Sequence, residues 1–377
     1  MVVGSIPTAA IFWFDYEIMK QVISINLKVS KYDIIVSQSE NDFFASLKKT
    51  IITNTFFVIT DENIERLHLE YFTNLLKQKS YNVRVSTIPA GEIGKSIKSL
   101  SILYTKALEV GIDRKSCVIA LGGGVVGDVA GFFAATYMRG INYVQVPTTL
   151  LAMTDSSVGG KTAINTRDGK NIAGVFYQPN FVWINSSFLN TLPKRHIKNG
   201  LAEVIKYALV FDKKFYDYLS NTINNELISS KDFNYIIYKS CSYKAKVVEK
   251  DEKETTGLRA VLNFGHTFAH ALETLTKYRK FLHGEAVAMG MLFAAELSLV
   301  SKTCRLETYK EIESLLKKAD FILNLKINEQ RLLTLMKKDK KSIDKNIKFV
   351  LIRNIGKTVN AHVKDNLVLY ALKKFLR

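Results

Sequence analysis

The sequence of 377 residues predicts two domains: an α/β domain with a mostly parallel sheet over residues 19–198 and a mainly α-helical domain over residues 199–377. Short apolar runs alternate with amphipathic segments up to about residue 185, a pattern typical of strands joined by helices. Long helical patterns dominate after Leu192-Pro193. The chain has only five prolines and no Pro/Gly-rich linker, so we expect the domains to pack directly against each other, with ligand sites favoured in the cleft between them.

The N-terminal domain is predicted element by element from this alternation. The expected strands are short apolar runs, at 33–39, 56–64, 81–89, 117–121, 143–149 and 181–185. Helices are expected at 64–78, at 95–111 and directly after the glycine-rich turn that follows residue 121. Residues 1–18 lack the basic segment of a signal peptide and are predicted to be an extension outside the fold.

The C-terminal domain is predicted from apolar residues at helical spacing. The expected helices lie at 199–219, 233–250, 264–278, 286–302, 307–319 and 329–338. One segment, 347–359, is predicted to be a late strand or hairpin.

Composition and charge exclude several classes of partner. The formal net charge is +18, but basic residues are spread along the chain and mixed with acids; the one dense run, 337–345, has no accompanying aromatic-and-basic RNA motif. We therefore expect no nucleic-acid partner. No apolar run reaches the roughly 18 residues of a membrane helix, so no membrane is expected either. Three widely spaced cysteines argue against a disulfide framework and favour the cytoplasm.

A glycine-rich turn follows one predicted strand and opens a helix. Gly122–Asp128 (GGGVVGD) satisfies G-x-G-x-x-G in the context where backbone N–H groups approach a pyrophosphate at a helix N-terminus. The next strand ends without the acidic residue of the usual dinucleotide fingerprint, so the domain is predicted to be Rossmann-like without being an ordinary Rossmann domain. The structural alternative is a tight turn that needs glycine, with Asp128 as a helix-dipole carboxylate instead of a ribose or nicotinamide contact.

Polar loops elsewhere in this domain suit recognition of phosphate and hydroxyl groups. The segment 89–96 resembles a P-loop, but its first glycine would fall on Pro89, which excludes an NTPase; Glu92 could instead accept hydrogen bonds from ribose, with Lys95 near phosphate. Thr148-Thr149 ends a strand at the carboxyl edge, where α/β sheets bind ligands. The segment 155–162 (DSSVGGKT) and Lys170-Asn171 add hydroxyls, an acid and lysines. The alternative for these segments is a glycine-turned hairpin with solvated lysines.

Three of the six histidines lie within residues 266–283. His266 and His270 are four residues apart on one predicted helix face, a spacing that can present two nitrogens to one metal ion, and His283 precedes the next helix. Glu203 enters an otherwise apolar helix face, where its carboxylate needs Lys206 or a metal as partner. The alternative is a pair of hydrogen-bonded core histidines and a surface histidine. Additional polar groups near the histidines in sequence are Lys244, Arg259 and Asn263.

The order of the longer motifs resembles that of the 3-dehydroquinate synthase family. The matching segments run from about residue 90 to 357 and include GGGVVGD, QVPTTLLAMTDSSVGGKTAIN, GKNIAGVFYQP, GLAEVIKYAL, GLRAVLNFGHTFAHA, LHGEAVAMGM and IKFVLIRNIGKT. The resemblance implies a dimeric, NAD-dependent, zinc- or cobalt-requiring lyase of the shikimate pathway. Such an enzyme converts 3-deoxy-D-arabino-heptulosonate 7-phosphate to 3-dehydroquinate and phosphate. Alternatives are a related cyclase of the valiolone or inosose type and a metal-dependent polyol dehydrogenase.

The resemblance also assigns roles residue by residue. It implies a metal site formed by Glu203, His266 and His283, so that His270 becomes a substrate contact instead of a ligand. It implies NAD contacts at Asp61, Ala90, Gly91, Glu92, Ile93, Gly94, Lys95, Gly124, Val125, Val126, Gly127, Asp128, Thr148, Thr149, Lys161, Lys170, Phe188, Leu189, Asn190 and Thr191. It implies catalytic and substrate contacts at Asp155, Asn171, Lys206, Lys244, Arg259, Asn263, His270, Lys340 and Lys341, with Arg139 reaching the phosphate site of the neighbouring subunit.

The sequence departs from the family pattern at three places. Ala269 stands where glycine is usual, and Ala90 replaces a usual acid. The segment 251–259 is one residue longer than usual at Thr255-Thr256, which predicts a shift of Arg259 relative to Lys244. None of these changes removes a ligand or a charged contact, so we expect an active enzyme.

Overall fold

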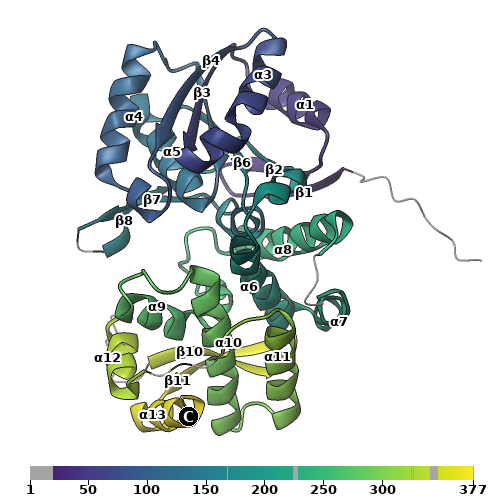
Figure 1. Ribbon diagram of the computed structural model, residues 1–377, viewed down its shortest axis with the longest axis vertical. Coiled ribbons are helices and arrows are strands. Elements are labelled where there is room, and N and C mark those ends of the chain that lie inside the picture. The colour runs from purple at the N-terminus through teal and green to yellow at the C-terminus, as the bar shows by residue number, and fades with distance from the viewer. Residues whose placement is uncertain are drawn as a thin grey trace, which may run out of the picture.

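The computed structural model describes residues 20–167, 169–223, 228–323, 325, 327–339 and 347–376. The predicted extension 1–18 lies outside the described residues. Figure 1 shows a sheet-containing part above a helical part, with α6 (Lys194–Phe211) and α8 (Ser230–Lys250) where the two meet. The N-terminal α/β and C-terminal helical architecture predicted from the sequence is confirmed.

The upper part is built on a seven-stranded sheet. Its order is β1 (Gln21–Asn26), β2 (Lys31–Val36), β9 (Phe181–Ile184), β6 (Asn142–Pro147), β5 (Cys117–Gly122), β3 (Thr55–Asp61) and β4 (Asn82–Ile88). Neighbouring strands are parallel except β1, which pairs antiparallel with β2. The mostly parallel sheet is therefore confirmed. The segment 181–185, predicted as the last strand, is last in sequence but central in the sheet, because β9 pairs with both β2 and β6.

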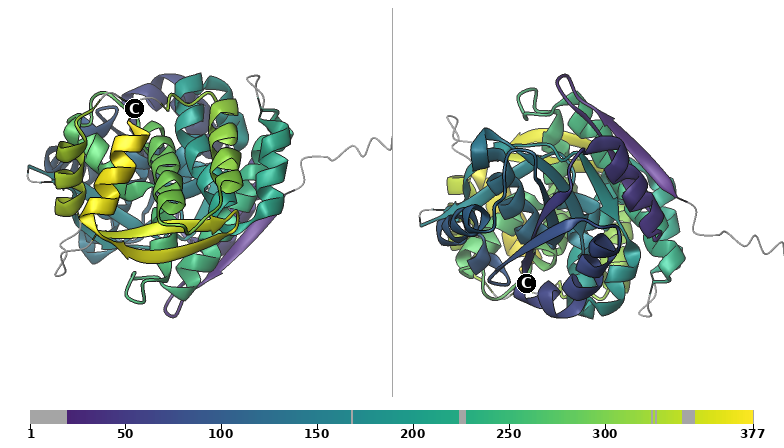
Figure 2. Two further views of the ribbon diagram at one scale, coloured as in Figure 1. Left: turned by 90° about the horizontal axis from the view of Figure 1, so that it is seen from below. Right: turned by 90° about the horizontal axis from the view of Figure 1, so that it is seen from above.

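Helices cover both faces of this sheet, and its interior strand β5 is buried on both sides. Cys117, Ile119 and Leu121 of β5 pack into one apolar cluster, whereas Val118 and Ala120 pack into a second. This explains why the strand reads as a continuous apolar run instead of an alternating one. The helices are α1 (Glu40–Thr50), α2 (Glu62–Ile64) with a π-helical segment (Glu65–Leu69), α3 (Glu70–Gln78), α4 (Ile97–Glu109) and α5 (Gly124–Thr136). Figure 2 shows the sheet and its helices from above.

The lower part is a helical bundle that also holds one hairpin. Its elements are α7 (Lys213–Thr222), α9 (His266–Leu275), α10 (His283–Val300), α11 (Leu306–Lys318), α12 (Glu329–Asp339), the strands β10 (Ile347–Asn354) and β11 (Lys357–Val363), and α13 (Asp365–Phe375). Helix α10 is apolar on all sides and packs against α6, α9, α11 and α13. By length and composition it could cross a membrane, but 78% of that window is buried within the fold, as in a core helix.

Several predicted boundaries differ from the observed ones. The helix expected at 199–219 is two helices, α6 and α7, because Asp212 leaves helical geometry and its carboxylate accepts hydrogen bonds from the N–H groups of Lys214 and Phe215. The hairpin expected at 347–359 is present. The sequence patterns did not indicate α1, α13 or the edge strand β1.

Candidate functional site

Three ligand-type side chains meet where α6, α9 and α10 approach one another. Glu203 lies in the middle of α6 and is fully buried, while His266 is the first residue of α9 and His283 the first of α10. Glu203 Oε1 is 3.5 Å from His266 Nε2 and 3.6 Å from His283 Nε2. One potential ligand atom from each residue lies within 4.8 Å of the others. The structure thus brings together the three residues that the family resemblance selects.

The other ring nitrogen of each histidine has its own partner. His266 Nδ1 is 3.2 Å from the carbonyl oxygen of Phe264, and His283 Nδ1 is 3.2 Å from Glu273 Oε1. A carbonyl and a carboxylate can only accept, so each Nδ1 carries the proton and each Nε2 faces Glu203. This is the arrangement by which a second shell orients metal-binding imidazoles.

The electrostatics of the cluster favour an ionised Glu203. Burial raises the pKa of the carboxyl, but the adjacent Lys206 ammonium, with which it forms an ion pair, and His283 together lower it to about 2. Burial and Lys206 hold the pKa of His266 well below its usual value. Oε2 is the oxygen that pairs with Lys206, whereas Oε1, which is inaccessible to solvent, faces the Nε2 atoms of both histidines. A buried carboxylate with spare acceptor capacity beside two imidazoles fits a divalent cation.

A second buried cluster lies beside this site and contains Asp155. Lys244 Nζ donates to Asp155 Oδ1 (2.7 Å) and to its carbonyl oxygen (2.8 Å), and the Tyr207 hydroxyl donates to Oδ1 (2.5 Å). Burial raises the pKa of Asp155, but Lys244 and Lys206 outweigh it and lower that pKa. Predicted substrate residues from both parts of the chain therefore converge here.

Arg259 remains close to Lys244 despite the longer preceding segment. Both side chains are buried, and the positive charge of Arg259 is among the groups that, after burial, lower the pKa of Lys244. Asp251 accepts hydrogen bonds from the backbone N–H groups of Thr256 and Arg259, which folds the additional residue into a compact turn. Glu254 contacts both Lys161 and, at 3.4 Å, Arg259 Nε. The predicted shift therefore leaves the cationic cluster intact.

The glycine-rich turn between β5 and α5 lies at the carboxyl edge of the sheet. A Cβ atom at Gly124 would lie 2.8 Å from Ser156 Oγ, so the backbone approaches the 155–162 segment more closely than a side chain allows. Asp128, in the first turns of α5, forms an ion pair with Lys95. The hydroxyl oxygen of Thr148 is buried and lacks a hydrogen-bond partner among the described residues. These features fit a dinucleotide bound across the turn.

The loop containing Glu92 faces the hairpin β7 (Lys161–Thr166)–β8 (Gly169–Phe176) across a cleft of about 560 Å³. Glu92 Oε1 is 3.3 Å from Lys170 Nζ, and the Lys170 ammonium also lies 4.1 Å from the centre of the Tyr278 ring. Asn171, in the same hairpin, has a φ of +56°. The hairpin that was the alternative interpretation of this segment is present, and it carries the predicted contact residues as well.

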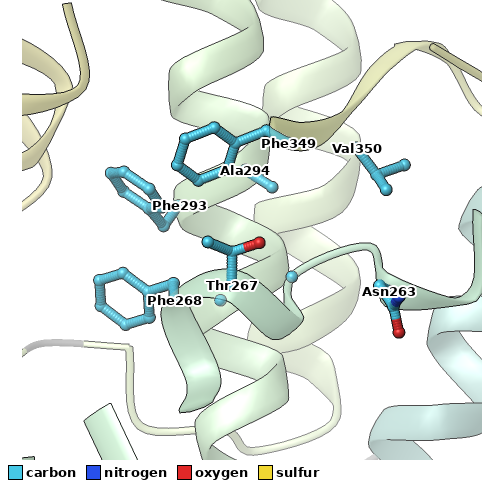
Figure 3. A pocket seen from close by; sticks show the side chains of 9 residues that line it. Asn263, Thr267, Phe268, Phe293, Ala294, Phe349 and Val350 are labelled. Carbon is cyan, nitrogen blue, oxygen red and sulfur yellow. The ribbon is translucent and has the colours of Figure 1, made fainter. Parts of the chain in front are cut away.

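Other predicted site residues lie in different surroundings. His270 is next to His266, with ring centres 5.6 Å apart. Asn263 is exposed and lies beside a narrow cavity, at the opposite side from Phe268, Phe293 and Phe349 (Figure 3). The carboxylate of Asp61 caps α2 by accepting from the Asn63 and Ile64 N–H groups.

The segment Phe188–Thr191 forms part of a short 3₁₀ helix, Ser186–Thr191, and the side chains of Phe188 and Leu189 are buried. Thr191 Oγ1 is hydrogen-bonded to His68 at 2.7 Å. Arg139 occupies a turn of positive φ between Met138 and Gly140. Lys340 and Lys341 lie outside the described residues.

Sequence reasoning did not identify several residues that contact the site. Glu273 supports His283, Tyr207 donates to Asp155, and Asn165 contacts Glu92. A signal for Glu273 was present: it lies seven residues after His266, and thus on the same helix face two turns later.

Comparison with solved structures defines the class first. A 2-deoxy-scyllo-inosose synthase complexed with carbaglucose-6-phosphate, NAD⁺ and Co²⁺ superposes with a TM-score of 0.84 at 24% identity, covering 94% of this chain and 100% of that chain. A 2-epi-5-epi-valiolone synthase from Streptomyces hygroscopicus with NAD⁺ and Zn²⁺ bound gives a TM-score of 0.84 at 25% identity, covering 93% and 98%. A probable glycerol dehydrogenase from Sinorhizobium meliloti is more distant, at 0.63 and 14%, covering 92% and 96%. The fold is that of the sugar phosphate cyclases.

Sequence comparison then identifies the family. The family model for the 3-dehydroquinate synthase N-terminal region matches residues 85–199, and the C-terminal model matches 200–342. A 3-dehydroquinate synthase of Endomicrobium trichonymphae is 73% identical over 357 residues, covering 95% of this chain and 99% of the relative. Another, from Thermoanaerobacter pseudethanolicus, is 44% identical over 354 residues, covering 93% and 99%. The chain belongs to the 3-dehydroquinate synthase family.

Proposed function

We propose that this chain is a 3-dehydroquinate synthase that converts 3-deoxy-D-arabino-heptulosonate 7-phosphate to 3-dehydroquinate and phosphate, using NAD⁺ and Zn²⁺ or Co²⁺. One observation carries the proposal: a buried Glu203 faces His266 and His283 in a chain 73% identical to a 3-dehydroquinate synthase. Two structural neighbours with NAD⁺ and Co²⁺ or Zn²⁺ bound support the cofactors.

Glu203, His266 and His283 would hold the metal. Three protein ligands leave coordination positions open to substrate hydroxyls, as in catalytic metal sites. Lys206 keeps Glu203 ionised and would also lie beside a metal-bound substrate. His270 is one turn along α9 from His266, with ring centres 5.6 Å apart, and would contact the substrate instead of completing the metal shell.

The glycine turn, Thr148, Thr149 and the 90–95 loop would bind NAD⁺. The cofactor supplies reversible hydride transfer, and the metal supplies charge stabilisation at a substrate oxygen. The contribution of the chain is to orient the dinucleotide at the end of the sheet, with Asp128 and Glu92 as acceptors for hydroxyl groups. Asp61, whose carboxylate already caps α2, would act at the edge of this site.

Basic side chains would bind the two anionic ends of the substrate. Lys244 and Arg259 are buried cations, and Lys161 and Asn171 lie on the hairpin above them. Buried cations suit carboxylate or phosphate groups that bring their own negative charge. These residues would hold the phosphate in place while it leaves, so that none of them has to act as a base.

We further propose a cytoplasmic homodimer in which Arg139 reaches the phosphate site of the partner subunit. Arg139 is exposed within a turn of positive φ, and the exposed apolar side chains of the α/β domain include Ile93, Ile97, Ile172, Val175 and Phe176, which a partner subunit would cover. We place the division between the domains at residue 198, within the first turns of α6, the helix that lies where the two parts meet. Light scattering of the purified protein tests the dimer; a monomer at assay concentration would contradict it.

The activity is tested by incubating the full chain with NAD⁺, Zn²⁺ and the heptulosonate phosphate while measuring phosphate and absorbance at 340 nm. We expect stoichiometric phosphate release without net NADH, because the hydride returns to the product. No phosphate release would contradict the proposal. Turnover of a heptulose or hexose phosphate in parallel assays would instead indicate a valiolone or inosose synthase, and steady NADH formation a polyol dehydrogenase.

A further inference from the structure

The side chain of Asn165 joins the 92–95 loop to the β7–β8 hairpin. Its Nδ2 donates to Glu92 Oε2 at 2.8 Å, and its Oδ1 accepts from the backbone N–H of Asn171 at 3.0 Å. Its own backbone N–H donates to the carbonyl of Lys95 at 2.9 Å. One residue therefore contacts both segments through three hydrogen bonds.

Each of these bonds fixes a residue with a proposed role. Glu92 is otherwise paired with Lys170, and Lys95 with Asp128 of the glycine turn. Asn171 has a φ of +56°, in the left-handed region that residues other than glycine seldom adopt. The hydrogen bond to its N–H holds the backbone of Asn171 in that conformation.

We propose that Asn165 is a positioning residue that couples the dinucleotide site to the substrate site. The inference rests on the proposed function. The amide is suited to this place because it donates to a carboxylate at one end and accepts from a backbone N–H at the other. Aspartate could only accept, and alanine could do neither. Asn165 sets the position of Glu92 on the NAD⁺ side and of Asn171 on the substrate side.

The test measures NAD⁺ affinity by calorimetry, and KM and kcat for the heptulosonate phosphate, on full-length Asn165→Ala and Asn165→Asp proteins. For Asn165→Ala we expect the Kd for NAD⁺ and the KM each to rise about tenfold, with a smaller change in kcat. Asn165→Asp loses the bond to Glu92 but keeps the acceptor for Asn171, so the Kd for NAD⁺ should rise while the KM stays near that of the unaltered protein.

A double-mutant cycle with Glu92→Gln separates coupling from general damage to the hairpin. When both substitutions are combined, the amide introduced by Glu92→Gln can donate to the carboxylate introduced by Asn165→Asp, so the hydrogen bond is restored with its direction reversed. In the Glu92→Gln background, Asn165→Asp should therefore have little additional effect on NAD⁺ binding. The matched structural control is Thr162→Val, which removes a hairpin hydrogen bond to the Val175 carbonyl and should change thermal stability but not the Kd.

Two results would overturn the inference while leaving the proposed function standing. One is an Asn165→Ala protein with unchanged Kd and KM; the other is an Asn165→Asp effect that is equal in the unaltered and the Glu92→Gln backgrounds. Absence of NAD⁺ binding by the unaltered protein would instead overturn the proposed function, and this inference with it.

Discussion

Glu273 is expected to control metal affinity through its contact with His283. The Glu273 side chain is 8% exposed, and its Oε1 lies 3.2 Å from His283 Nδ1. By accepting the Nδ1 proton it orients the ring so that Nε2 faces Glu203. Removing such a partner lowers metal affinity by about 10- to 100-fold, equivalent to roughly 1.4–2.8 kcal/mol. We therefore expect Glu273→Ala to raise the Kd for Zn²⁺ within that range. Glu273→Gln keeps an acceptor oxygen and should have a smaller effect.

The assay is Zn²⁺ competition against a chromophoric chelator, with protein free of NAD⁺ and substrate, so that the result does not depend on turnover. Glu285→Gln is the matched control: this carboxylate is two residues from His283 but accepts from the Leu282 N–H and pairs with Arg195. It should leave the Kd nearly unchanged. A folded Glu273→Ala protein that holds Zn²⁺ as tightly as the unaltered chain would refute the reasoning.

Three further outcomes are expected. Zn²⁺ at 100 times its Kd should stabilise the folded protein by about 2.7 kcal/mol, seen as a higher melting temperature in scanning calorimetry; an unchanged transition would contradict a native-state metal site. His270→Ala should retain Zn²⁺ in metal analysis but lose phosphate release, whereas His266→Ala should lose both; loss of metal from the His270 variant would make it a ligand. Lys374→Met should lower the free energy of unfolding in urea by about 2 kcal/mol, because it leaves the buried Glu296 carboxylate, now 2.6 Å from Lys374 Nζ, without its ion-pair partner. An unchanged midpoint of urea unfolding would show that water solvates the Glu296 carboxylate in place of the lysine.

The fold was predictable where local pattern and burial agree. The fully buried strand β5 reads as an apolar run, and β10 contains a short apolar run that ends before Arg353, so both were predicted at nearly their observed positions. The position of β9 within the sheet was not, because strand order depends on long-range pairing that no local pattern contains. The division between α6 and α7 was missed because the apolar spacing continues past Asp212, while the cap that separates the helices depends on one side chain.

Single residues in the sequence predicted the kind of chemistry at the site but not which of them meet in the structure. Spacing alone favoured His266 and His270 as a metal pair. It did not decide whether the partner of Glu203 is Lys206 or a metal. The family resemblance selected His283 instead, and the distances place its Nε2 near Glu203. Asn165 was missed because two of its partners, Glu92 and Lys95, lie on a loop about 70 residues earlier in the sequence. Its role follows from three-dimensional contacts.

Close packing at glycines explains how His283 comes to lie next to Glu203. A Cβ atom at Gly284 would lie 2.0 Å from the carbonyl oxygen of Asn199, so only glycine lets the start of α10 rest against α6, next to Glu203. A Cβ atom at Gly290 would likewise lie 2.1 Å from the carbonyl oxygen of Gly265, which brings α10 against the start of α9. The two contacts place the first residues of α9 and α10, His266 and His283, around Glu203 of α6. The glycines of the LHGEAVAMGM and NFGHTFAHA motifs therefore determine the geometry of the candidate metal site as directly as the histidines do.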